Sequence, residues 1–180
     1  ATLEGKAMHN VQNAMFAASM AFSLGVSLDS IRQGLRTFDT SFFQAPGRMN
    51  VYAEHPFKVI LDYGHNAHAV GMMTDLMQRM DVSNRKMVVL AAPGDRRDED
   101  IRDIADVVSG KYDVYVLKRD DGLRGRDGDE VPRMLAERLK ANGVPEAAIH
   151  VIPDEQQAID AALNMAEAGD LLLVFGDALA

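Results

Sequence analysis

Residues 57–117 read FKVILDYGHNAHAVGMMTDLMQRMDVSNRKMVVLAAPGDRRDEDIRDIADVVSGKYDVYVL. Short apolar runs typical of buried strands alternate here with segments of helical periodicity. We expect strands over 57–62, 86–92 and 112–117, with helices over 67–80 and 98–109 between them. Because parallel strands need crossover connections, this order predicts a largely parallel sheet with helices on both faces.

The same alternation continues on both sides of this stretch. Towards the C-terminus we expect a helix over 130–141, a strand over 148–152, a helix over 155–168 capped by Asp154, and a last strand over 170–175. Upstream, a strand over 48–53 precedes a turn at His55-Pro56. The pattern predicts an α/β, doubly wound domain from residue 45 onwards.

Residues 1–44 have a helical pattern instead. One helix is expected over 6–24, with apolar residues on one face from Val11 to Phe22, and Gly25 ends it. Ser27 is placed to cap a second helix over 28–36. Two helices make only half a core, so we expect a partner surface upstream in a longer protein.

Composition excludes several classes of function. The 180 residues carry 19 Lys and Arg against 27 Asp and Glu, a net charge of -8, which argues against nucleic-acid binding. There is no cysteine, so disulfides and thiolate metal sites are excluded. No apolar run approaches the roughly 20 residues that cross a bilayer. We expect a soluble, cytoplasmic protein without membrane partners.

Familiar catalytic motifs are absent. The sequence has no Gly-x-Gly-x-x-Gly after its first strand, no Walker phosphate loop and no Gly-x-Ser-x-Gly elbow. His65 and His68 are close in sequence, but no further His or Cys accompanies them, so no metal site is predicted. An autonomous NTPase, dinucleotide oxidoreductase or serine hydrolase is therefore not expected.

Charged loops follow three of the expected strands. They are residues 62–66 (DYGHN), 93–98 (PGDRRD) and 118–126 (KRDDGLRGR). In such folds ligands bind beyond the carboxyl ends of strands, where these loops converge. Each loop alone could be a solvated connection, and Asp95 and Arg96 could serve only as a helix cap and surface charge. Three charged loops at one edge favour a functional site.

Five motifs carry a resemblance to a known family. They are residues 5–14 (GKAMHNVQNA), 45–49 (APGRM), 62–66 (DYGHN), 93–100 (PGDRRDED), and Asp120-Asp121 followed by 124–126 (RGR). In order and approximate spacing they resemble the Mur-type ATP-dependent amide ligases, and within that family the carboxy-terminal region of the cyanophycin synthetases. The family loop usually continues His-Asn-Pro, whereas Ala67 follows Asn66 here.

The resemblance implies a fold and an ATP site. Residues 1–44 would be the helical end of a central P-loop ATPase domain, and residues 45–180 the Rossmann-like carboxy-terminal domain. ATP would lie between the two, with Mg²⁺ held mainly by the missing P-loop domain. The ATP-binding residues implied are Asn10 and Asn13 for adenine, Arg48 for phosphates, Asp62 for ribose hydroxyls, and His65 beside the nucleotide. An amide pairs with the edge of a base, a guanidinium with phosphate oxygens, and a carboxylate with neighbouring hydroxyls.

The resemblance also implies an amino-acid substrate, with arginine joined to an acidic polymer or peptide acceptor. Carboxylates at Asp95, Asp98, Asp120 and Asp121 would suit its cationic side chain, and Arg124 or Arg126 its carboxylate. Arg96 is a further candidate substrate residue.

Alternatives stay open at this point. One is another Mur-type ligase, such as a peptidoglycan-precursor ligase, and another is a non-catalytic binding module. Homo-oligomer formation is possible as well. We expect the 180 residues alone to form no amide bond, because they lack a phosphate-binding loop.

Overall fold

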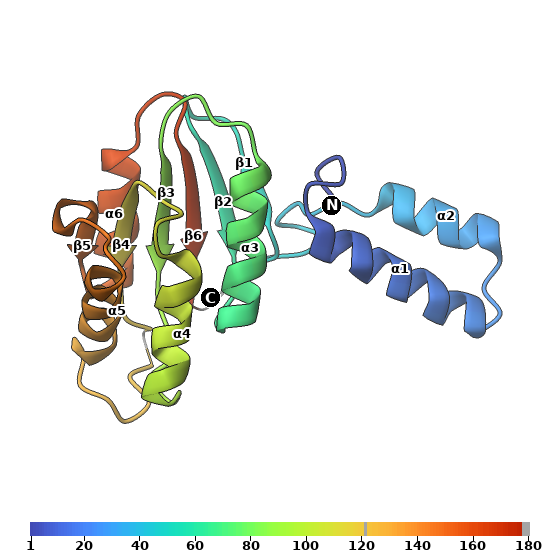
Figure 1. Cartoon of the computed structure of the whole chain (residues 1–180). Coiled ribbons are helices and arrows are strands. Elements are labelled where there is room, and N and C mark those ends of the chain that lie inside the picture. Colours follow the sequence, from blue (N-terminus) through green and yellow to red (C-terminus); the bar gives the residue numbers. More distant parts are fainter. Residues whose placement is uncertain (121, 178–180) are drawn as a thin grey trace.

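The computed structural model describes residues 1–120 and 122–177, and it sets a pair of helices apart from an α/β body (Figure 1). Helix α1 spans Met8–Ser23 and α2 spans Leu28–Thr37. Gly25 follows α1 at φ +82°, a left-handed conformation that glycine adopts without strain. The Ser27 hydroxyl accepts a hydrogen bond from the backbone N–H of Ser30 at 3.2 Å. Both predicted helices and their end signals are confirmed.

Helices α1 and α2 pack on each other but leave large apolar side chains uncovered. Met15, Phe16 and Met20 are 65%, 69% and 63% exposed. A groove of about 660 Å³ between the two helices is lined mainly by small and apolar residues. The predicted need for a partner surface is consistent with this exposure. Among the described helices, none is long and apolar enough to span a membrane.

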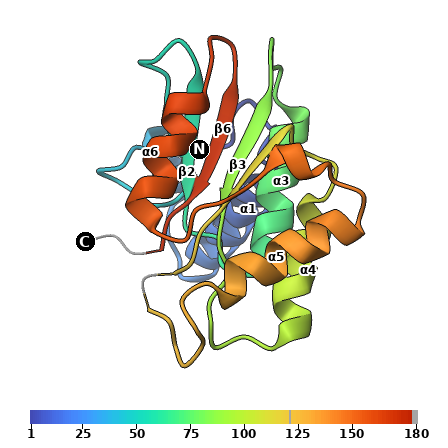
Figure 2. The ribbon, with the colours of Figure 1, turned by 90° about the vertical axis from the view of Figure 1, so that its left-hand side faces the viewer.

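The α/β body contains one six-stranded sheet in the order β1-β2-β6-β3-β4-β5. The strands are β1 Asn50–Tyr52, β2 Lys58–Asp62, β3 Lys86–Leu90, β4 Val114–Leu117, β5 Ile149–Val151 and β6 Leu171–Phe175. All neighbouring strands run parallel except β1, which pairs antiparallel with β2. The last strand in sequence, β6, thus lies between β2 and β3 (Figure 2).

Helices cover both faces of the sheet, as predicted. Helices α3 (Ala67–Arg79), α4 (Asp98–Val108) and α5 (Glu130–Ala141) lie on one face, and α6 (Glu155–Met165) lies on the other (Figure 2). A short 3₁₀ turn, Glu146–Ala148, precedes β5. The predicted helices and strands are all present, and their ends differ from the prediction by at most three residues.

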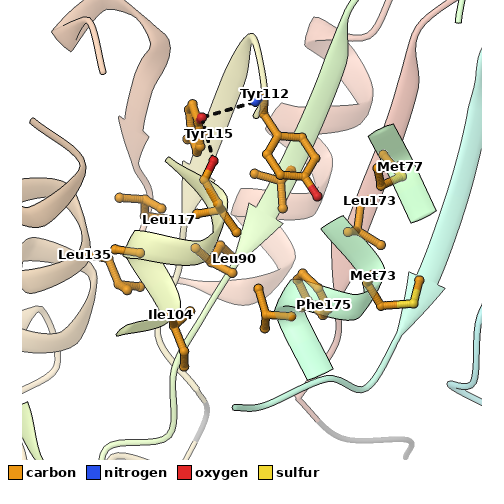
Figure 3. Close-up of a cluster of buried hydrophobic side chains, with 14 of the residues drawn as sticks. Met73, Met77, Leu90, Ile104, Tyr112, Tyr115, Leu117, Leu135, Leu173 and Phe175 are labelled. Atoms are coloured by element: carbon orange, nitrogen blue, oxygen red, sulfur yellow. Dashed lines mark hydrogen bonds between the residues drawn. The ribbon is translucent and has the colours of Figure 1, made fainter. Parts of the chain in front are cut away.

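Two apolar clusters hold these layers together. On the three-helix face, Met77, Leu90 and Ile104 pack with the aromatic ring of Tyr115 (Figure 3). The Tyr115 hydroxyl donates to the backbone oxygen of Val108 at 2.9 Å, so its polar end is satisfied within the core. On the other face, small side chains of α6 pack on the sheet. The rigid sheet fixes the position of the loops that leave its carboxyl ends.

Candidate functional site

A pocket of about 130 Å³ opens at the carboxyl ends of the central strands; we call it the rim pocket. It lies where β6 is inserted between β2 and β3, a reversal of strand order at which open α/β sheets bind ligands. Its lining comes from four loops: Tyr63, Gly64, His65, Ala91, Pro93, Arg96, Asp120, Arg124, Phe175, Gly176 and Asp177. Four predicted site residues therefore lie together, namely His65, Arg96, Asp120 and Arg124.

The Asp120 carboxylate is the main acidic group of the rim pocket. Asp120 is only 8% exposed, yet within residues 1–120 and 122–177 it forms no hydrogen bond or ion pair. Burial raises the pKa of Asp120, as does the nearby carboxylate of Asp177, while the charges of Lys118 and Arg124 act to lower it. A nearly buried carboxylate without a protein donor is a natural binding group for a cation.

Two arginines line the rim pocket, and they differ in whether they form an ion pair with another described residue. The guanidinium of Arg124 pairs with Asp95 at 3.2 Å. Arg96 is exposed, and in the part of the chain that the structure describes its guanidinium forms no hydrogen bond or ion pair, although its charge acts on Asp100. Among the described residues, the rim pocket therefore offers the carboxylate of Asp120 and the guanidinium of Arg96 to a ligand with both charges.

Arg126 lies behind the rim pocket rather than in its lining. Its guanidinium forms ion pairs with Asp98 at 2.7 Å and Glu130 at 2.5 Å. It also donates to the backbone oxygens of Gly94 and Arg96, both at 2.8 Å. These contacts tie the loop after β3 to the loop after β4. The sequence predicted Arg126 as a substrate residue, but in the structure it joins two of the loops that line the rim pocket.

Gly94 lets these two loops approach closely. A Cβ atom at this position would lie 2.4 Å from the backbone oxygen of Leu123, whereas one at Gly71, inside α3, would meet nothing closer than 3.8 Å. We expect Gly94→Ala to lower the free energy of unfolding by about 1–3 kcal/mol, and Gly71→Ala to raise it by about 0.5–1 kcal/mol. Urea denaturation measures both. Equal effects would contradict the close approach of the loops.

A second group of predicted residues surrounds Asp62, at the end of β2. Its carboxylate accepts a hydrogen bond from the backbone N–H of Met49 at 3.0 Å. Burial raises the pKa of Asp62, and backbone hydrogen bonds from Met49 and Gly64 oppose that rise, as do the charges of Arg48 and His9. The Asp62 carboxylate is thus held by backbone hydrogen bonds near the guanidinium of Arg48.

Arg48 is presented by a turn that the sequence fixes locally. The side chain of Asn50, only 1% exposed, accepts from the backbone N–H of Gly47 at 2.7 Å and donates to the oxygen of Ala45 at 2.9 Å. The exposed Arg48 guanidinium lies 5.7 Å from the centre of the Tyr63 ring, a cation–π distance. Because Tyr63 also lines the rim pocket, it connects the Asp62 group to that pocket.

The predicted adenine residues lie on α1, close to the same group. The Asn10 amide contacts the sulfur of Met49 at 3.8 Å and donates to the oxygen of Ala1 at 2.9 Å. Asn13 donates to Asn10 at 3.4 Å. Met49 therefore contacts both Asn10 and Asp62, which brings α1 and the end of β2 together.

Other candidate residues have local roles in the structure. The ring of His65 hydrogen-bonds through Nδ1 to the backbone oxygen of Tyr63 at 3.1 Å. Asp121 lies outside the described residues. Among those that the structure does describe, no group of three or more His, Cys, Asp or Glu side chains is placed to hold a metal ion.

Residues 47–178 match the family described as "Mur ligase, glutamate ligase domain". The chain belongs to the Mur ligase family. It is 36% identical over 185 residues to a cyanophycin synthetase of Nostoc sp. and 34% identical over 178 residues to one of Synechocystis sp.. In each case the match covers 99% of this chain and 20% of the relative.

The chain is also similar to other ligases, at lower identity or in fold. The chain is 29% identical to a UDP-N-acetylmuramoyl-L-alanyl-D-glutamate–2,6-diaminopimelate ligase of Caldanaerobacter subterraneus, over 94% of this chain and 33% of that protein. Its fold resembles a UDP-N-acetylmuramate–alanine ligase of Thermotoga maritima, with a TM-score of 0.66 and 20% identity over 94% of this chain and 35% of that one. It also resembles E. coli FolC in complex with ADP, with a TM-score of 0.62 and 28% identity over 83% and 31% of the two chains.

Helix α3 begins at Ala67, and the chain has no proline at this first helical position. The Asn66 side chain accepts from the backbone N–H of Ala69 at 2.9 Å, and this cap satisfies the helix end without a proline. The start of α3 therefore does not depend on a proline.

Sequence reasoning missed three residues of the candidate site. They are His9, whose Nδ1 is buried with no partner among the described residues, and Tyr63 and Asp177, which line the rim pocket. Tyr63 lies in the motif of residues 62–66 and His9 in that of residues 5–14, so both could have been selected from the sequence. Asp177 comes after the last expected strand, where only the position of β6 in the sheet brings it to the pocket.

Proposed function

We propose that this chain is the amino-acid-binding and nucleotide-closing part of an ATP-dependent amide ligase of the cyanophycin synthetase type. The single observation that supports this most is that Asp120 and Arg96 both line the rim pocket, and that within the described residues neither side chain forms a hydrogen bond or ion pair. A free amino acid carries both complementary charges. The identity to cyanophycin synthetases over almost the whole chain favours arginine as that amino acid.

The proposed binding mode follows from charge. The guanidinium of arginine binds Asp120, with the carboxylate of Asp177 adding negative potential, and the arginine carboxylate binds Arg96. The pocket volume of about 130 Å³ is well below the roughly 300–1,000 Å³ of sites for larger organic ligands. A single amino acid suits this volume better than a nucleotide or a sugar peptide.

The Asp62 group is the proposed nucleotide side of the site. Arg48 would bind the phosphates of ATP, Asp62 the ribose hydroxyls, and Asn10 and Asn13 the adenine, with His65 near the nucleotide. The Arg48 guanidinium is exposed and its turn is fixed by Asn50, which suits a preorganised phosphate contact. FolC, which shares this fold, has been solved with ADP.

In the proposed reaction, the γ-phosphoryl group of ATP passes to a carboxylate of an acidic polymer, giving an acyl phosphate and ADP. The amine of the bound arginine then attacks the acyl carbon, the amide forms and phosphate leaves. The residues of this chain hold the amine donor and close over the nucleotide. A P-loop domain elsewhere in the ligase would supply Mg²⁺ and the phosphate-binding loop.

Calorimetric titration of the 180-residue chain tests the amino-acid pocket. We expect arginine to bind at least about tenfold more tightly than citrulline, which has nearly the same shape but no side-chain charge, because a charge-assisted hydrogen bond contributes about 1.5–3 kcal/mol. Lysine should bind more weakly than arginine, since its ammonium cannot engage a carboxylate in a two-pronged contact. Equal binding of arginine and citrulline would contradict the proposal.

The same titration tests diaminopimelate as a second candidate substrate. The similarity to a diaminopimelate-adding ligase favours diaminopimelate, whose two amino-acid ends also carry both charges. Binding of diaminopimelate in preference to arginine would assign the chain to a peptidoglycan-precursor ligase.

A further inference from the structure

Tyr63 is the residue at which the rim pocket and the Asp62 group meet. It directly follows β2 and lines the rim pocket. Its ring makes an edge contact with the ring of His65, another lining residue, with 5.9 Å between the two ring centres. The guanidinium carbon of Arg48 lies over the same Tyr63 ring, 5.7 Å from its centre. One aromatic side chain therefore contacts both the rim pocket and the proposed phosphate-binding residue.

The pairing of β1 with β2 explains why Arg48 meets Tyr63. The two strands run antiparallel, and counting on by two residues from the last residue pair of their ladder leads to Arg48 on one chain and Tyr63 on the other. Between these positions the backbone N–H of Met49 donates to the Asp62 carboxylate at 3.0 Å, which holds the two chains side by side. The contact between guanidinium and ring is thus set by the sheet, as cross-strand contacts are.

The Tyr63 ring contacts Arg48 without using its hydrogen-bond donors. Arg48 is exposed, and within the described residues its guanidinium forms no hydrogen bond or ion pair, although its charge acts on Asp62. A guanidinium carries five N–H donors in its plane, and the attraction of its charge to an aromatic face requires none of them. A two-pronged ion pair with a carboxylate would occupy two. The ring therefore restricts Arg48 and leaves its donors for an anion.

We propose that Tyr63 is a positioning residue for Arg48: its ring holds the guanidinium at the boundary between the rim pocket and the Asp62 group, with the donors free for a phosphate. This inference rests on the proposed function for the phosphate, but not for the contact between ring and guanidinium. The turn fixed by Asn50 holds the backbone of Arg48, and the ring restricts the long side chain beyond it. A side chain that is already restricted loses less conformational entropy when it binds.

Binding of ADP to the 180-residue chain, followed by NMR titration, tests this role. We expect Tyr63→Leu to weaken ADP binding by about two- to fivefold, the size expected for a cation–π contact at an exposed site. Tyr63→Phe keeps the aromatic face and should bind ADP within about twofold of the wild type. Adenosine, which has no phosphate, should bind equally to the wild type and to Tyr63→Leu.

Tyr52 provides the matched control. It ends β1 and packs with the apolar cluster on the α6 face of the sheet, so Tyr52→Leu removes a partly buried tyrosine that does not contact Arg48 in the described structure. We expect this variant to bind ADP as the wild type does. Thermal unfolding confirms that each variant keeps the native fold.

A double-mutant cycle separates positioning from a general structural effect. Arg48→Gln removes the guanidinium, so in that background Tyr63→Leu should weaken ADP binding no further. Additive effects of the two substitutions would overturn the positioning role. An equal loss of adenosine affinity in Tyr63→Leu would overturn it as well, because adenosine has no group for Arg48 to bind.

The Nε–Hε resonance of Arg48 reports the contact without any ligand, because the face of an aromatic ring shifts nearby protons upfield. We expect this shift in the wild type and in Tyr63→Phe, and its loss in Tyr63→Leu. If the resonance behaves in this way but the wild-type chain binds no ADP, the contact is supported and the proposed phosphate role of Arg48 is wrong. If the resonance is the same in all three proteins, the inference itself is overturned.

Discussion

Asp120→Asn is expected to weaken arginine binding by about tenfold to a hundredfold, because it removes a charge-assisted contact of about 1.5–3 kcal/mol. The control is Asp95→Asn. Asp95 lies on the same rim, but it is exposed and paired with Arg124, and exposed ion pairs contribute little. Calorimetry with arginine measures both variants.

The stability of Asp120→Asn makes this test more specific. Burial raises the pKa of Asp120, so the charged form is less favourable in the folded chain than in the unfolded one. At neutral pH the asparagine variant should therefore be as stable as the wild type, or more stable. A loss of arginine affinity without a loss of stability would identify a binding residue. Unchanged affinity would place the amino acid elsewhere.

Asp170→Ala is expected to lower the free energy of unfolding by about 2–4 kcal/mol, because it removes a charge-assisted ion pair and leaves two backbone N–H donors without their acceptor. The Asp170 side chain is fully buried and pairs with Arg85 at 2.7 Å. It also accepts from the backbone N–H groups of Arg85 at 2.9 Å and Glu167 at 2.8 Å. These bonds join the starts of β3 and β6.

The pH dependence of this effect has a definite sign. Burial raises the pKa of Asp170, but the hydrogen bonds from Arg85 and from the backbone N–H of Glu167 outweigh it, so the pKa lies below its ordinary value of 3.8. The stabilisation is therefore present above that ordinary value and is lost as the pH falls below it. Urea denaturation at pH 7 and at pH 3 measures the change. Asp170→Ala should differ from the wild type less at pH 3 than at pH 7.

An exposed aspartate gives the matched control. Asp160, on the surface of α6, bonds only to Gln156 among the described residues, so Asp160→Ala should change the free energy of unfolding by less than about 0.5 kcal/mol at either pH. Equal losses in Asp160→Ala and Asp170→Ala would contradict the importance of the buried pair.

The sequence predicted the elements well because hydrophobic periodicity is a local property. Apolar runs marked the strands, and Ser27 and Asp154 marked helix starts that the structure confirms. The position of β6 between β2 and β3 was not predicted. Strand order depends on contacts between segments that lie far apart in sequence, and no local pattern in residues 171–175 specifies their neighbours.

The sequence predicted which residue types form the candidate site. It did not predict which of these charged side chains form ion pairs within the protein. Asp95, Asp120, Arg96 and Arg126 looked equivalent as charged loop residues. The structure separates them, since Arg126 is held by Asp98 and Glu130 and Asp95 is paired with Arg124. Such pairings arise between loops about thirty residues apart, and within the described residues they leave Asp120 and Arg96 without a hydrogen bond or ion pair. The ligand assignments themselves stay predictions.

The position of β6 bears on how the protein is made. A ribosome has synthesised the five other strands before Leu171 emerges, and until then the β1–β2 pair and the strands from β3 to β5 have no strand to join them. Both groups present unpaired strand edges during that interval, which invite aggregation and degradation. A product that stops before Leu171 lacks the centre of the sheet and, with it, Phe175 and Asp177 of the rim pocket. Incomplete products therefore cannot form the rim pocket, and cellular proteases can degrade them.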